Sequence, residues 1–216
     1  MGPRTLSDTL TLSNQVLMPQ LGFGVYESPT NICVRSCSSA LETGYRHIDT
    51  AQYYGNEAQV GHAVMQSGIS RESVFLTTKI LAAGDAASEV YQRCLDSVEK
   101  LDPQNHFVDL FLVHSPNCSK AQRKLLWQAL ERLYHERKAK SIGVSNFGIK
   151  HIEELKHFAG VWPPHVNQIE VRPIGMDPTC TSRTLTWYNS YILGCNNQRL
   201  SATVESTESS FRHTAP

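Results

Sequence analysis

Four side chains in the first half of the chain could together carry out proton-transfer chemistry: Asp49, Tyr54, Lys79 and His114. They end or follow three successive apolar segments. A tyrosine, with an unperturbed pKa of about 10, is a poor acid near neutral pH. An adjacent ammonium group lowers that pKa, and a carboxylate can hold the ammonium charged and in place. With an imidazole to bind the substrate oxygen, the set predicts a site that protonates a carbonyl oxygen.

Each residue taken singly also has an ordinary structural interpretation. Tyr54 could pack half-buried, Lys79 could be a solvated end of a strand, and His114 could be a structural histidine. Asp49 could pair with Arg46 or cap the following turn. Their joint placement in ordered segments is what favours the catalytic interpretation.

The segments around these residues resemble the aldo-keto reductase superfamily. The block Asp-Thr-Ala-x-x-Tyr-Gly-x-Glu stands at 49–57, with Tyr54 five residues after Asp49. Segments 21–26, 143–147 and 166–170 are similar to the first barrel strand and to two nicotinamide-binding strand ends of the family. The resemblance runs from about residue 10 to residue 171.

The resemblance implies reversible hydride transfer between a nicotinamide cofactor, NADP(H), and a carbonyl or alcohol substrate. Tyr54 would be the proton donor, and Lys79, paired with Asp49, would lower its pKa. His114 would bind and orient the substrate oxygen, and Tyr26 would line the substrate pocket. The substrate itself and the physiological direction are left open.

The same resemblance implies the cofactor-binding residues. Ser145 and Asn146 would hold the nicotinamide carboxamide, Gln168 would complete that grip, and Asp49 would approach the ribose. Hydroxyl and amide groups suit a carboxamide, which offers both a donor and an acceptor. Neither the family's segment for the 2′-phosphate nor a G-x-G-x-x-G fingerprint is found in the sequence, so we expect weakened cofactor affinity.

Strand and helix patterns alternate along most of the chain. Strands are expected at 21–25, 47–50, 74–78, 108–113, 141–144 and 166–171, and helices at 31–43, 57–66, 88–101, 120–138 and 150–159. An alternating hairpin is expected ahead of them at 9–18. Regular alternation argues for parallel βαβ units, with catalytic residues at the carboxyl ends of the strands. The predicted fold is α/β: an incomplete (β/α)8 TIM-type barrel of about five βα units and a sixth strand.

The alternation stops near residue 171. We therefore expect a partial aldo-keto reductase-like barrel at 1–173 and a divergent tail at 174–216 that is rich in Ser and Thr and irregular. Whether that tail belongs to the protein or results from an error in the gene model stays open at this stage.

Composition narrows the function classes. The chain has 216 residues, of which 40% are hydrophobic, and its 20 basic and 20 acidic residues cancel. This balance argues against nucleic acid or an anionic membrane as a partner. With no long apolar run and no signal-peptide core, the default location is the cytoplasm. Six cysteines without metal-ligand spacing predict no metal site; Cys33 and Cys37 would share one buried helix face.

A second function remains open beside the enzyme. A catalytically impaired aldo-keto reductase-like protein could act as a regulatory or partner-binding subunit. An unclosed sheet exposes strand edges, so an oligomer or a partner could cover the open side of the barrel.

Overall fold

The computed structural model describes residues 5–84, 86–170 and 188–191. Its strands are β1 Thr9–Thr11, β2 Leu17–Pro19, β3 Phe23–Gly24, β4 His47–Asp49, β5 Phe75–Ile80, β6 Val108–Val113, β7 Ala139–Ser145, β8 Asn167–Glu170 and β9 Tyr188–Tyr191. Its α-helices are α1 Thr30–Thr43, α2 Glu57–Gln66, α3 Ala87–Leu101, α4 Lys120–His135 and α5 Ile149–Lys156. Two short 3-10 helices, η1 Gln52–Tyr54 and η2 Arg71–Ser73, complete the described elements.

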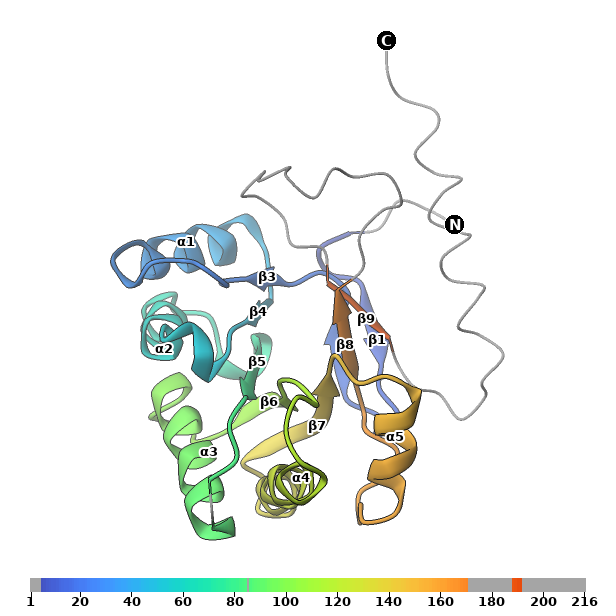
Figure 1. Cartoon of the computed structure of the whole chain (residues 1–216). Coiled ribbons are helices and arrows are strands. Elements are labelled where there is room, and N and C mark those ends of the chain that lie inside the picture. Colours follow the sequence, from blue (N-terminus) through green and yellow to red (C-terminus); the bar gives the residue numbers. More distant parts are fainter. Residues whose placement is uncertain (1–4, 85, 171–187, 192–216) are drawn as a thin grey trace, which may run out of the picture.

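Six parallel strands, β3 to β8, lie side by side in chain order and form a curled half-barrel. The five α-helices follow one another round the outside of this sheet (Figure 1). Every residue of β5 and β6 is buried, as expected for parallel strands that are covered on both faces. The predicted incomplete TIM-type barrel is thus confirmed.

The hydrophobic core has two parts. The larger fills the space between the sheet and the helices, with Trp127 of α4 and Phe111 of β6 fully buried in it. The smaller lies inside the curl, where Leu12 and Met18 of the β1–β2 hairpin pack with Phe75 and other sheet residues. The predicted N-terminal hairpin therefore exists, and it covers one end of the barrel interior.

The ends of three helices can be compared with the expected ranges. The helix α1 stops at Gly44, whose φ of 109° is left-handed and accessible to glycine. The expected extension of α4 to Lys138 is wrong, because Arg137 adopts a φ of 59° and ends the helical path. The helix expected from residue 88 begins one residue earlier, at Ala87, and Ala86 before it provides no side-chain cap.

Part of the predicted tail can be compared with the structure. Tyr188–Tyr191 forms β9, which pairs antiparallel with β8, so these four residues are a strand rather than irregular chain. The predicted boundary at 173 and the rest of the tail lie outside the described residues. Within the part of the chain that the structure describes, no helix is long and apolar enough to cross a bilayer.

Candidate active site

Three neighbouring strands bring the four candidate catalytic residues to one edge of the sheet. Asp49 is the last residue of β4, Lys79 lies near the end of β5, and His114 directly follows β6. Tyr54 ends the short helix η1, which follows β4. Because β4, β5 and β6 are parallel and adjacent, their carboxyl ends meet. The strand ladder extends to this edge, where the His114 amide donates to the Ile80 carbonyl at 2.9 Å.

Lys79 is the centre of the site. Its ammonium group forms a short salt bridge with Asp49 Oδ1 and donates to the Thr50 carbonyl at 2.9 Å. The same Nζ lies 3.3 Å from the Tyr54 hydroxyl oxygen. The side chains of Lys79 and Asp49 are 1% and 0% exposed, so this charge pair is shielded from water. Such a cation next to a phenol stabilises the phenolate.

The alternative pairing of Asp49 with Arg46 is wrong. Arg46 does not reach Asp49; its guanidinium donates to the main-chain carbonyls of Leu41 and Tyr45 at 3.0 and 2.8 Å. The lysine on the next strand takes the carboxylate instead.

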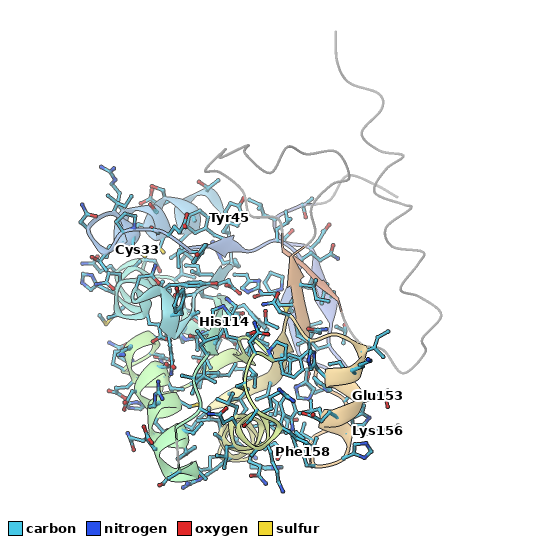
Figure 2. All side chains as sticks on the ribbon, viewed as in Figure 1. Cys33, Tyr45, His114, Glu153, Lys156 and Phe158 are labelled. Atoms are coloured by element: carbon cyan, nitrogen blue, oxygen red, sulfur yellow. The ribbon has the colours of Figure 1, made fainter. Side chains whose placement is uncertain are left out.

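His114 is labelled near the middle of the view in Figure 2. Its ring lies edge-on to the Tyr54 ring, with centroids 5.7 Å apart. Burial, and then the positive charge of Lys79, lowers the pKa of His114 to about 4. The imidazole is therefore neutral near pH 7, with one N–H donor and one acceptor nitrogen. Its buried Nδ1 has no hydrogen-bond partner among the described residues.

The loop after His114 is held by an arginine. Arg123 of α4 donates to the Pro116 carbonyl at 2.9 Å and forms a two-pronged salt bridge with Glu154 of α5, at 2.8 and 3.0 Å. Ser119 caps α4 in a reciprocal pair with Gln122. These contacts fix the chain that leaves the site.

The three residues predicted to hold the nicotinamide carboxamide also gather at this edge. Ser145 ends β7 and is buried, Asn146 follows it and is exposed, and Gln168 lies opposite Ser145 in β8. The main-chain carbonyl of Gln168 accepts hydrogen bonds from Ser145 Oγ at 3.0 Å and from the main-chain N–H of Asn146 at 2.9 Å. Asn146 Nδ2 in turn donates to the His114 carbonyl at 3.1 Å.

A second contact, between two side chains, also joins the two groups of residues. Gln168 Nε2 donates to Asp49 Oδ2 at 2.8 Å, so the carboxylate that holds Lys79 also holds the amide from β8. All the predicted catalytic and cofactor residues are thus linked to at least one other by a hydrogen bond or an aromatic contact within one connected group, and the predicted substrate residue Tyr26 joins it through its ring contact with Tyr54.

Two tyrosines flank the site. The centroid of the Tyr26 ring lies 5.0 Å from that of the Tyr54 ring, and Tyr26 is 55% exposed. The predicted substrate-pocket residue thus lies beside the four candidate catalytic residues. Tyr53, 66% exposed, lies edge-on to His114 with ring centroids 6.3 Å apart. The sequence interpretation missed Tyr53; the only signal in the sequence was a second aromatic residue directly before Tyr54.

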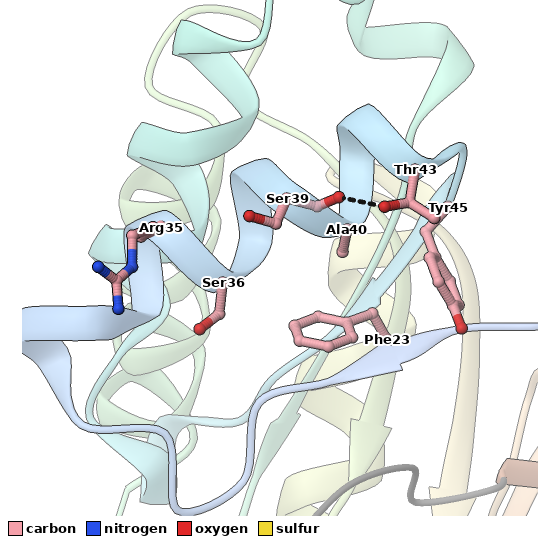
Figure 3. Close-up of a pocket in the computed structure, with 7 residues that line it drawn as sticks. All are labelled: Phe23, Arg35, Ser36, Ser39, Ala40, Thr43 and Tyr45. Atoms are coloured by element: carbon pink, nitrogen blue, oxygen red, sulfur yellow. Dashed lines mark hydrogen bonds between the residues drawn. The ribbon is translucent and has the colours of Figure 1, made fainter.

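A separate surface hollow of about 380 Å³ lies between β3 and α1, lined by Phe23, Arg35, Ser36, Ser39, Ala40, Thr43 and Tyr45 (Figure 3). None of the four candidate catalytic residues lines this hollow. The buried thiols of Cys33 and Cys37 lie on one face of α1, as expected. The described residues contain no cluster of three or more His, Cys, Asp or Glu able to hold a metal ion.

Comparisons with known proteins agree with this geometry. The chain is 40% identical over 172 residues to the glyoxal reductase of Bacillus subtilis, covering 79% of this chain and 60% of that protein. It is 40% identical over 166 residues to the 9,11-endoperoxide prostaglandin H2 reductase of Trypanosoma cruzi, covering 76% and 57%. The chain therefore spans about three-fifths of the length of these relatives.

Solved structures give the same result. An aldo/keto reductase from Brucella melitensis superimposes with a TM-score of 0.71 at 41% identity, covering 76% of this chain and 63% of that one. A Bombyx mori aldo-keto reductase in complex with NADP gives 0.69 at 30% identity, covering 78% and 59%. The sequence profile of the aldo/keto reductase family matches residues 29–189. On this combination of fold, site and sequence, the chain belongs to the aldo/keto reductase family.

Proposed function

We propose that this protein is an NADP(H)-dependent oxidoreductase that interconverts a carbonyl compound and its alcohol, with Tyr54 as the proton donor. The observation that carries the proposal is the buried Lys79 ammonium, which lies 3.3 Å from the Tyr54 hydroxyl and is neutralised by Asp49. A phenol in this setting is a stronger acid than a free tyrosine.

The residues at the ends of β7 and β8 suit the nicotinamide half of the cofactor. Ser145, Asn146 and Gln168 offer a hydroxyl and two amides within one hydrogen-bonded group. This donor and acceptor set matches a carboxamide. The Bombyx mori aldo-keto reductase binds NADP in its solved structure, which supports the same cofactor here. When bound, the cofactor supplies or accepts the hydride.

The proton chemistry follows from the protein groups. Neutral His114 donates a hydrogen bond to the substrate oxygen and orients it. Tyr54 gives its proton to the oxygen as negative charge develops there, and the Lys79 ammonium stabilises the phenolate that remains. Removing one donor of this kind commonly costs about 3 kcal/mol of transition-state stabilisation. In the reverse direction the Tyr54 phenolate takes the proton from the alcohol.

Tyr26 and Tyr53 are proposed to bind the substrate beside these groups. Their rings are about half or more exposed and adjoin Tyr54 and His114. Exposed aromatic faces bind apolar and planar groups. The substrate is thus a carbonyl compound whose non-reacting part can lie against the two rings.

The experiment uses the full 216-residue chain, NADPH and an aromatic aldehyde, with cofactor absorbance as the readout. Tyr54→Phe should lower kcat by at least a hundredfold, whereas Tyr53→Phe, its matched neighbour, should keep kcat within a fewfold. Equal losses in the two variants would contradict the role of Tyr54.

A partner-binding function without turnover is the second candidate. It is favoured by β3, which forms the edge of the seven-stranded sheet and pairs only with β4 among the described strands. A folded chain that neither binds NADPH nor reduces any aldehyde would favour this function over the enzyme.

A further inference from the structure

Gln168 makes a contact across the inside of the half-barrel. It lies on β8, whereas Asp49 lies on β4, and β5, β6 and β7 separate the two strands in the sheet. The 2.8 Å bond from Gln168 Nε2 to Asp49 Oδ2 therefore spans the interior of the curl. Both residues are buried, Asp49 at 0% and Gln168 at 6% exposure, so water does not compete for the bond.

The backbone of Gln168 is held independently of this contact. Its main-chain carbonyl accepts two hydrogen bonds from the end of β7, one from Ser145 Oγ and one from the main-chain N–H of Asn146. The side chain thus starts from a fixed point, and its amide group can act as a rigid support for the carboxylate.

The two oxygens of Asp49 are divided between two donors. Oδ1 accepts from Lys79, and Oδ2 accepts from Gln168. A hydrogen bond to Oδ2 draws negative charge away from Oδ1, so the carboxylate neutralises the Lys79 ammonium less completely. More of the positive field of Lys79 then reaches the Tyr54 oxygen, 3.3 Å from Nζ.

From this arrangement we infer that Gln168 is a positioning residue that acts through Asp49 on the Lys79–Tyr54 pair, and so strengthens Tyr54 as an acid. The catalytic meaning of this role rests on the proposed function. The second N–H and the carbonyl oxygen of this amide make no hydrogen bond to another of the described residues, and they could bind a cofactor carboxamide. The same side chain would thereby connect the cofactor pocket to the proton donor.

The test measures the Tyr54 titration directly, in the chain without cofactor and without turnover. Protein labelled with 13C at the tyrosine ring carbon that bears the hydroxyl is titrated by NMR, and the Tyr54 signal is assigned by its absence in Tyr54→Phe. Gln168→Met, which keeps the length but removes the donor, should move the Tyr54 midpoint to higher pH by about half a unit or more, roughly threefold in the acid constant. Gln168→Asn shortens the side chain by one carbon and so withdraws the amide from Asp49, while it keeps the side chain polar. It serves as the second variant if Gln168→Met does not fold, and it should shift the Tyr54 midpoint in the same direction.

Two controls separate this role from a general structural effect. Asn167→Met alters the neighbouring residue of β8, whose amide bonds the Phe147 backbone instead of Asp49, and should leave the Tyr54 midpoint unchanged. In an Asp49→Asn background, Gln168→Met should cause no further shift, because the charge through which it acts is gone. A Tyr54 midpoint that moves no more with the Gln168 variants than with Asn167→Met overturns the inference. Because the readout needs no catalysis, absent reductase activity with the expected shifts would refute the proposed function alone.

Discussion

Replacing Lys79 with Met should destabilise the fold more than any loss of packing explains. The substitution conserves length and apolar stem but leaves Asp49, at 0% side-chain exposure, as a buried carboxylate without its cation. Breaking a buried ion pair from one side costs about 3–5 kcal/mol. Gln168 still donates to Oδ2, so we expect the lower end of that range, about 3 kcal/mol.

Urea unfolding followed by circular dichroism measures this loss. With a slope of about 2 kcal/mol per molar, the midpoint should fall by about 1.5 M. Lys140→Met is the matched control: its ammonium lies 2.9 Å from Asp109, but its side chain is 38% exposed. This more exposed pair should be worth less than about 1 kcal/mol.

A double variant tests the cause. Asp49→Leu together with Lys79→Met removes both charges, and the pair of changes should cost less than Lys79→Met alone, because no buried charge is left unpaired. The reasoning is refuted if Lys79→Met costs no more than Lys140→Met, or if the double variant is less stable than the single one.

Three further predictions concern pH and substrate. Burial lowers the pKa of His47 below its ordinary 6.5, so the free energy of unfolding should be highest above about pH 6.5 and should decrease as the pH falls. The urea midpoint should therefore be lower at pH 5.5 than at pH 7.5, and this difference should be smaller in His47→Gln. Burial raises the pKa of Glu57, so its contribution favours folding at low pH and is lost as the pH rises through the folded pKa. Glu57→Gln should therefore be more favourable relative to wild type at pH 8 than at pH 5, and the opposite order in urea titrations would exclude this account. Tyr53→Ala should lower kcat/KM for benzaldehyde about tenfold through loss of an aromatic contact beside His114, and that for glyoxal less than twofold; equal losses for both aldehydes would argue against ring contact.

The sequence was sufficient to predict the half-barrel because its strands are strongly patterned. β6 is a continuous apolar segment after Asp109, and α2 occupies the expected 57–66. The expected helix end at residue 43 is correct, because the left-handed conformation of Gly44 after it is a local property of glycine. Local rules were less exact at the start of α3, which begins at Ala87 after Ala86, a residue whose side chain cannot cap a helix.

The site was predictable only in part, for a physical reason. Strand order places Asp49, Lys79 and His114 at one edge once the strands are known to be parallel. The choice of Lys79 over Arg46 as the partner of Asp49 depends on side-chain direction, which alternates along a strand and is not given by spacing alone. The Gln168–Asp49 bond joins residues 119 positions apart across the barrel interior, so no local pattern could indicate it.

The proposed reduction of a carbonyl compound with Tyr54 as proton donor is tested most directly by following hydride transfer from NADPH to the substrate carbon. The 216-residue chain is incubated with benzaldehyde and NADPH deuterated at both C4 positions, and the benzyl alcohol formed is analysed by mass spectrometry. The account predicts alcohol carrying one deuterium on its carbinol carbon, formed by Tyr53→Phe but reduced at least a hundredfold in Tyr54→Phe. Folded protein that yields no deuterated alcohol, or Tyr54→Phe that yields as much as wild type, would contradict it.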